Sequence, residues 1–115
     1  MAEVKVDGRM TVKTFCERFK ETFNATLRVY DGRKCAAADA TLASLRKEGC
    51  TGGEMTCTDE DTVEYFEYFI KNLYGIHVEV ATIDDWVLVI DQMPLGRIKE
   101  IGKNASKAQM EAMLK

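Results

Sequence analysis

The first half of the chain has a pattern of apolar and polar positions that predicts a strand, a helix and a hairpin in succession. Apolar and charged residues alternate over residues 3–7, which is the period of a half-buried strand. Apolar residues then recur at helical spacing after Thr11, whose hydroxyl suits a helix N-cap. A second alternating stretch, residues 26–30, runs into Asp31-Gly32, a pair typical of tight hairpin turns because glycine accepts positive φ. A short return strand and a short helix complete this half.

The second half repeats this order of predicted elements. A strand is expected over residues 54–57, followed by a long helix that begins at the cap Thr62. The apolar run over residues 86–90 predicts a return strand, and Pro94 suits the first turn of a short helix. A C-terminal amphipathic helix over about residues 105–114 has no counterpart in the first half.

Direct alignment supports the same interpretation. Residues 3–30 align with residues 54–81 at a constant offset of 51 without a gap, and with a two-residue shift the match continues beyond them. Such a stretch has about two identities by chance. We therefore interpret the chain as two internal repeats, at about residues 3–50 and 54–102. The six identical pairs are Glu3/Glu54, Thr11/Thr62, Val12/Val63, Phe15/Phe66, Lys20/Lys71 and Val29/Val80.

These elements predict an α+β fold. We expect two tandem β-α-β-β-α units that form one mixed sheet, with the two long helices packed on one face and a C-terminal helix added. A unit of about 50 residues buries too little surface to be stable alone. We therefore expect residues 1–115 to form a single domain, in which the units pack through their helices. The expected contacts run from Phe15, Phe19 and Phe23 toward Phe66, Ile70 and Leu73.

Charge is distributed unevenly between the repeats. Residues 1–53 carry ten Lys/Arg and seven Asp/Glu, whereas residues 54–91 carry one Lys and ten Asp/Glu. Residues 92–115 carry five basic and two acidic residues, so the segments have net charges of +3, −9 and +3. Such asymmetry bears on association with partners and not on the fold.

Motifs for catalysis, metals and cofactors are missing from the sequence. The four cysteines have no CxxC spacing, the single histidine has no identifiable nucleophilic partner, and there is no glycine-rich phosphate loop. The acidic run over residues 59–61 is better explained as the start of a helix than as a cation site. We therefore expect no enzyme activity, no metal and no cofactor.

No apolar stretch is long enough for a membrane span, and the N-terminus lacks the apolar region of a signal peptide. The expectation is a protein that does not engage membranes and is located in the cytoplasm.

Aromatic residues on the second long helix are the main candidates for function. The apolar stripe of that helix is complete without Tyr65 and Tyr68, and the first repeat has Thr14 and Glu17 at the same places. Aromatic residues ringed by acids resemble an interface hot spot with a polar rim. The alternative is that the C-terminal helix or the other repeat covers them. The interface candidates are Tyr65, Tyr68, Phe69, Glu64 and Glu67.

The predicted function is a small non-catalytic interaction module, which binds a protein partner or self-associates through its second helix. One alternative is an acidic decoy that occupies a nucleic-acid-binding protein. The other alternative is a weak single-stranded nucleic-acid binder, although the chain is acidic and nucleic acid is therefore not the favoured partner. The residues for this last alternative are Arg28, Tyr30, Arg33 and Lys34.

Overall fold

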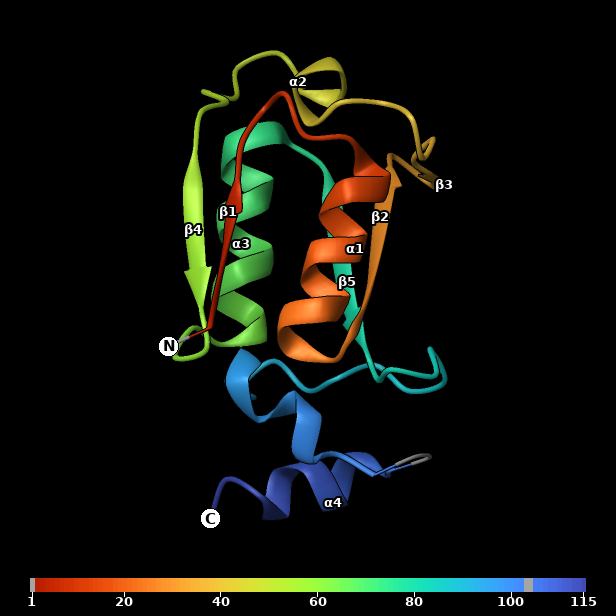
Figure 1. Ribbon diagram of the computed structural model, residues 1–115, viewed down its shortest axis with the longest axis vertical. Helices are drawn as coiled ribbons and strands as arrows, with labels where there is room; N and C mark the ends of the chain where they lie inside the picture. The colour runs from red at the N-terminus through yellow and green to blue at the C-terminus, as the bar shows by residue number, and fades with distance from the viewer. Residues whose placement is uncertain (1, 103–104) are drawn as a thin grey trace.

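The computed structural model describes residues 2–102 and 105–115, and it has the α+β composition that the sequence predicts (Figure 1). The first half contains β1 (Glu3–Val6), α1 (Val12–Phe23), β2 (Thr26–Asp31), β3 (Lys34–Cys35) and α2 (Leu42–Leu45). The second half contains β4 (Met55–Thr58), α3 (Val63–Tyr74), β5 (His77–Ala81), the 3-10 helix η1 (Leu95–Glu100) and α4 (Lys107–Ala112).

The two long helices begin and end for the same reasons in both halves. The hydroxyls of Thr11 and Thr62 each accept a hydrogen bond of 3.2 Å from the backbone N–H three residues later, so the predicted N-caps are confirmed. Asn24 and Gly75 end the helices in the left-handed conformation, with φ of 55° and 72°. Both residue types tolerate this conformation, which turns the chain into the following strand.

The strands form two separate antiparallel sheets, so the prediction of one mixed sheet is wrong. β1 pairs with β4 alone, and the other sheet has the order β3-β2-β5. The error has a physical cause. Alternation of apolar residues defines which face of a strand is buried, but it does not define which strand lies at its edge.

Both long helices pack on the buried face of the three-stranded sheet, α1 against β2 and α3 against β5, so the expected placement of the helices on one face holds for this sheet, although β1 and β4 are not part of it. α1 contacts both β1 and β2, and in Figure 1 β1 crosses in front of α3 while β5 lies behind the helices. The helices face each other across the core, where Phe66 lies 6.0 Å from Phe15 and 5.1 Å from Phe19 between ring centroids. The two ladders close the remaining sides, with alternate side chains such as Val4 and Val78 buried against the helices.

Each of the two long ladders contains one pair of residues that occupy equivalent positions in the two halves. Lys5 lies opposite Thr56 in the first ladder, and Arg28 lies opposite Glu79 in the second. Each of these pairs is separated by 51 residues, the offset of the sequence alignment. An exchange of the two halves therefore preserves the register of both ladders.

Backbone hydrogen bonds in the connecting segments also recur. Leu42 donates its N–H to the carbonyl of Met10 at 2.9 Å, and Leu95 donates to Asp61 at 2.8 Å. Met10 and Asp61 are 51 residues apart, whereas Leu42 and Leu95 are 53 apart, as the shifted alignment predicts. The same backbone contacts thus hold the short helices α2 and η1 against the start of each long helix.

Three predicted elements differ in the structure. The run over residues 86–90 is not a strand, because its only ladder-type contact is the isolated bridge between Ala81 and Leu88. The helix expected at Pro94 is the 3-10 helix η1, and α4 is shorter than the predicted tail helix. The apolar run divides between an exposed turn and the buried Val89 and Ile90, so it has no continuous strand face.

No helix of the described segments has the length and apolar character required to cross a membrane.

Candidate interaction surface

The first half of α3 carries two exposed tyrosines. The side chain of Tyr65 is 47% exposed and that of Tyr68 is 62% exposed, so neither the C-terminal helix nor the other half of the chain covers them within the described residues. Phe69 is partly buried and packs edge-on against Tyr65, with ring centroids 5.4 Å apart. Three of the predicted interface residues therefore lie on one flank of α3, with Tyr68 the most exposed.

The equivalent flank of α1 shows what this surface is like without aromatic rings. Thr14 and Arg18, which precede Tyr65 and Phe69 by 51 residues, line an open hollow beside the loop that follows β1. In the second half, the rings of Tyr65 and Phe69 stand at the corresponding positions. The two halves therefore share a backbone here but present different surfaces, one polar and hollow and the other aromatic.

Glu67 lies on the opposite flank of the same helix and is half-buried. The pKa of its carboxyl is raised to about 7, first by burial and then by the nearby carboxylates of Asp91, Glu79 and Glu64, against the opposing effect of the Val80 N–H. Low solvent access and like charges both disfavour the ionised form, so this carboxylate is destabilised at neutral pH.

Of the carboxylates in this group, Glu79 is paired with Arg28 and His77, whereas the others have no ion pair within the described part of the chain. Among the described residues, none of the ion pairs involves Glu64, Glu67 or Asp91. Glu64 is exposed and donates its backbone N–H to the carbonyl of Asp91 at 3.0 Å, which fixes the loop carrying Asp91 against α3. A cation supplied from outside the chain would stabilise this group.

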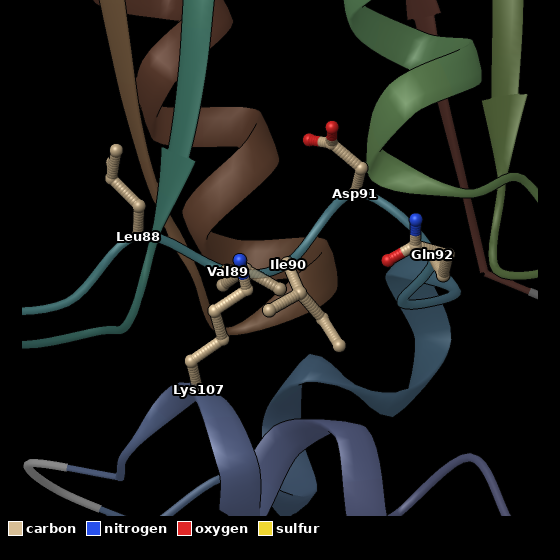
Figure 2. Close-up of a pocket in the computed structure, with 6 residues that line it drawn as sticks. All are labelled: Leu88, Val89, Ile90, Asp91, Gln92 and Lys107. Atoms are coloured by element: carbon tan, nitrogen blue, oxygen red, sulfur yellow. The ribbon is translucent and has the colours of Figure 1, made fainter.

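Figure 2 shows the open hollow next to this group, between the end of β5 and α4. The side chains of Leu88 and Asp91 point away from α4, and Lys107 reaches from α4 toward Val89. The hollow is lined by residues 88–92 and Lys107.

Two of the four residues considered for nucleic-acid binding are engaged within the chain. Arg28 donates from Nε to Asp85 Oδ1 at 2.7 Å and lies 3.5 Å from Glu79 Oε1. The Tyr30 hydroxyl donates to Glu79 Oε1 at 3.1 Å. Arg33 and Lys34 are exposed at the β2–β3 hairpin. The structure therefore does not present these four side chains as one free basic surface.

The sequence did not predict the exposure of two large apolar residues outside α3. Trp86 is 75% exposed and Leu88 is 47% exposed, although both were assigned to a return strand. The signal that pointed to them was the change of alignment offset from 51 to 53, because it requires two additional residues between β5 and η1.

The remaining reactive side chains are separate from this surface. All four cysteines are free thiols, and burial raises the pKa of Cys57 to about 12, so that thiol is not a nucleophile at neutral pH. His77 Nε2 lies 3.4 Å from Glu79 Oε2 on the outer face of the β2–β5 ladder. Across the described residues, no group of three or more His, Cys, Asp or Glu side chains is arranged to hold a metal ion.

Comparison with known proteins gives no relative from which a function could be inferred: no family model, no curated protein and no solved structure matches the chain.

Proposed function

We propose that the protein is a non-catalytic interaction module that binds a basic surface of a protein partner through the first half of α3. The observation that carries this proposal is the combination of two exposed tyrosines with three carboxylates, those of Glu64, Glu67 and Asp91, that form no ion pair within the described residues. Tyr68 is 62% exposed, and Glu67, which precedes it in sequence and lies on the other flank of α3, has a pKa of about 7, raised by burial and by three neighbouring carboxylates.

The tyrosines and the carboxylates favour binding for separate reasons. Tyrosine is enriched among the residues that dominate interface energies, because its ring buries a large area and loses little conformational entropy. The carboxylates favour a partner that carries Lys or Arg, and such a cation would lower the pKa of Glu67. Two copies of this face would bring like charges together, which disfavours a symmetric dimer through α3. Self-association would therefore have to pair this face with a basic region of a second copy.

The proposed evolutionary background is an internal duplication within one domain of residues 1–115. The self-equivalent ladder registers and the recurring backbone bonds are the support for it. On this interpretation, the residues that differ between copies at solvent-exposed positions are those that acquired a role. Tyr65 and Tyr68 replace Thr14 and Glu17 of the first copy.

The test uses the residues that the first copy already carries. The double variant Tyr65→Thr/Tyr68→Glu should retain the wild-type circular dichroism spectrum, because both side chains are exposed. In affinity capture from the native host, a basic protein retained by the wild type should be lost with this variant. A matched control, Thr14→Ala/Glu17→Ala on α1, should leave capture unchanged. Equal capture and equal oligomeric state for wild type and the α3 variant would rule out the interface.

The acidic decoy is a second proposal supported by the same uncompensated carboxylates. It requires the acids of residues 54–91 to act together, although Glu79 and Asp85 are already bound to Arg28. The distinguishing measurement is competition: a decoy displaces single-stranded DNA from the captured protein, whereas a simple binding module leaves the DNA bound. Direct filter binding of single-stranded DNA at low ionic strength tests the remaining alternative, and no binding would reject it.

A further inference from the structure

The turn that follows β5 is where the two halves of the chain differ in length. In the first half, Tyr30 pairs with Cys35 across the hairpin. The equivalent bridge in the second half joins Ala81 to Leu88. Four residues separate the first pair and six separate the second, so the two additional residues lie within residues 82–87.

This longer turn is held in one shape by hydrogen bonds of its own. The Thr82 side chain, of a residue only 3% exposed, donates to Asp84 Oδ1 at 2.6 Å and accepts from the Val87 N–H at 3.3 Å. Thr82 and Val87 also share a backbone bond of 2.9 Å, and the Trp86 N–H donates to Asp84 Oδ1 at 3.3 Å. Asp85 adopts φ of 62°, in the left-handed region that Asp tolerates better than most non-glycine residues.

The first half of the chain adds a second set of restraints. Arg28 binds Asp85 twice, from Nε to Oδ1 at 2.7 Å and from a terminal nitrogen to the backbone carbonyl at 3.0 Å. The Thr26 hydroxyl donates to the carbonyl of Ile83 at 3.1 Å. The turn is therefore fixed both internally and against β2.

The side chain that this fixed turn presents is the only tryptophan of the protein. Trp86 is 75% exposed, and Leu88 beside it is 47% exposed. A large apolar side chain on a braced turn loses little backbone entropy when it is covered by a partner. Tryptophan is also among the residue types most enriched at binding hot spots.

The charge around the turn indicates what would cover it. Residues 82–92 contain Asp84, Asp85 and Asp91 and no Lys, Arg or His, and of these three acids Asp85 is already paired with Arg28 of β2. Asp91 is fixed next to Glu64 and Glu67, so the acidic group of α3 continues to this loop. Lys107 is the one cation among the residues that line the hollow.

We propose that Trp86, Leu88 and Asp91 form a docking site for a cationic amphipathic segment of a partner polypeptide. In this site a Lys or Arg of the partner stacks on the indole, an apolar residue of the partner covers Leu88, and a further cation meets Asp91. This inference rests on the proposed function in one respect, namely that the same basic partner continues onto α3.

A defined probe tests the site. The probe is a short synthetic peptide of alternating arginine and leucine, with a glutamate–leucine peptide as the charge-reversed control. Binding of the basic peptide should change the emission of the single tryptophan, and calorimetry should give a dissociation constant that increases with salt. Trp86→Ala should weaken binding about tenfold, and Trp86→Phe should retain part of the affinity because the aromatic face remains. Leu114→Ala, at an exposed apolar position 38% accessible and far along the chain, should have no effect.

Further variants separate this site from the α3 surface. Replacement of residues 82–87 by the four-residue turn of the first half, Asp-Gly-Arg-Lys, should abolish the peptide-dependent binding in the same way as Trp86→Ala. If only the Trp86 variants lose affinity for the basic peptide, the result supports the docking site and contradicts the α3 surface. If only Tyr65→Thr/Tyr68→Glu loses affinity, the result contradicts the docking site and supports the α3 surface. Equal affinity for wild type, Trp86→Ala and Leu114→Ala would overturn the inference.

Discussion

Replacement of Glu67 by glutamine should make the protein more stable at alkaline pH and leave its stability nearly unchanged in mild acid. The glutamate is half-buried on α3, and its carboxyl has a pKa of about 7 because of burial and the neighbouring charges of Asp91, Glu79 and Glu64. In the unfolded chain the same carboxyl is solvated and titrates near 4.5. Glutamine has nearly the same shape as the protonated acid and carries no charge at any pH.

The sign and size of the effect follow from proton linkage. Between pH 4.5 and about 7 the folded state holds a proton that the unfolded state has lost, so the free energy of unfolding decreases as the pH rises through this window. Above about pH 7 both states are ionised, and the loss is complete. The full pKa difference corresponds to about 3 kcal/mol, and the partial solvent access of Glu67 reduces this to about 1–2 kcal/mol. Glu67→Gln should recover that amount at about pH 8.

The assay is urea denaturation of wild type and variant at about pH 5 and about pH 8, followed by circular dichroism. The two proteins should unfold at similar urea concentrations in acid and at different ones in base. Glu60→Gln is the matched control, because this exposed glutamate is not among the groups that act on Glu67. An identical pH dependence for wild type and Glu67→Gln would refute the assignment of a raised pKa to this residue. A shift of the Glu67 side-chain carbon signal near pH 4.5 in NMR would refute it independently.

Three further perturbations have definite expected outcomes. Gly96→Ala should lower the free energy of unfolding by about 1–3 kcal/mol, because the added Cβ would overlap that of Asp59. Adding Asp59→Gly should restore stability in thermal melts, and a double variant no more stable than Gly96→Ala would contradict this explanation. Phe66→Ala removes the ring that joins both helices and should lower the unfolding free energy by about 3–5 kcal/mol in urea, so a loss below 1 kcal/mol would show that the core collapses around the site. Arg28→Ala should lower the free energy of unfolding by no more than about 1 kcal/mol, since its ion pair with Glu79 is partly exposed. It should nevertheless lower the fluorescence anisotropy of the single tryptophan, because the turn loses the hydrogen bonds that Arg28 makes from β2. Unchanged anisotropy would mean that the turn holds its shape by its internal bonds alone.

The expected effect at Gly96 has an instructive counterpart in the first half. Gly8 is the equivalent of Asp59, and Ala43 is the equivalent of Gly96. A Cβ added at Gly8 would lie 3.1 Å from that of Ala43. Both halves thus bring the loop before the long helix close to the short helix, and each leaves room with one glycine, although on opposite sides of the contact. This compensation is visible only when the two halves are compared in space.

Local chemistry explains why many features were predictable from the sequence. Thr11 and Thr62 cap helices because a hydroxyl beside the first turn accepts an otherwise unpaired N–H, and no distant residue is required. Gly75 ends α3 because it takes positive φ without strain. The helical stripe of phenylalanines predicted which faces meet, and the contacts of Phe66 with Phe15 and Phe19 confirm it.

The candidate surface was predicted only in part. Tyr65 and Tyr68 were singled out by comparison with Thr14 and Glu17, and their exposure agrees with an interface without testing it. Trp86 was placed in a strand, because an apolar run has the same composition whether it lies in a ladder or divides between a turn and the core.

The sequence alone thus determined the α+β composition, the caps of the two long helices and their buried faces, because these depend on contacts a few residues apart or on side-chain period. Only the tertiary structure decided that β1 pairs with β4 and β2 with β5 in two separate sheets. It also decided that Arg28 secures the turn of Trp86 across 57 residues of sequence, and that Glu67 lies among carboxylates from other elements. The residues near a strand edge or a charged group do not determine which distant strand or charge becomes its partner. Those pairings are therefore decided only when the whole chain folds.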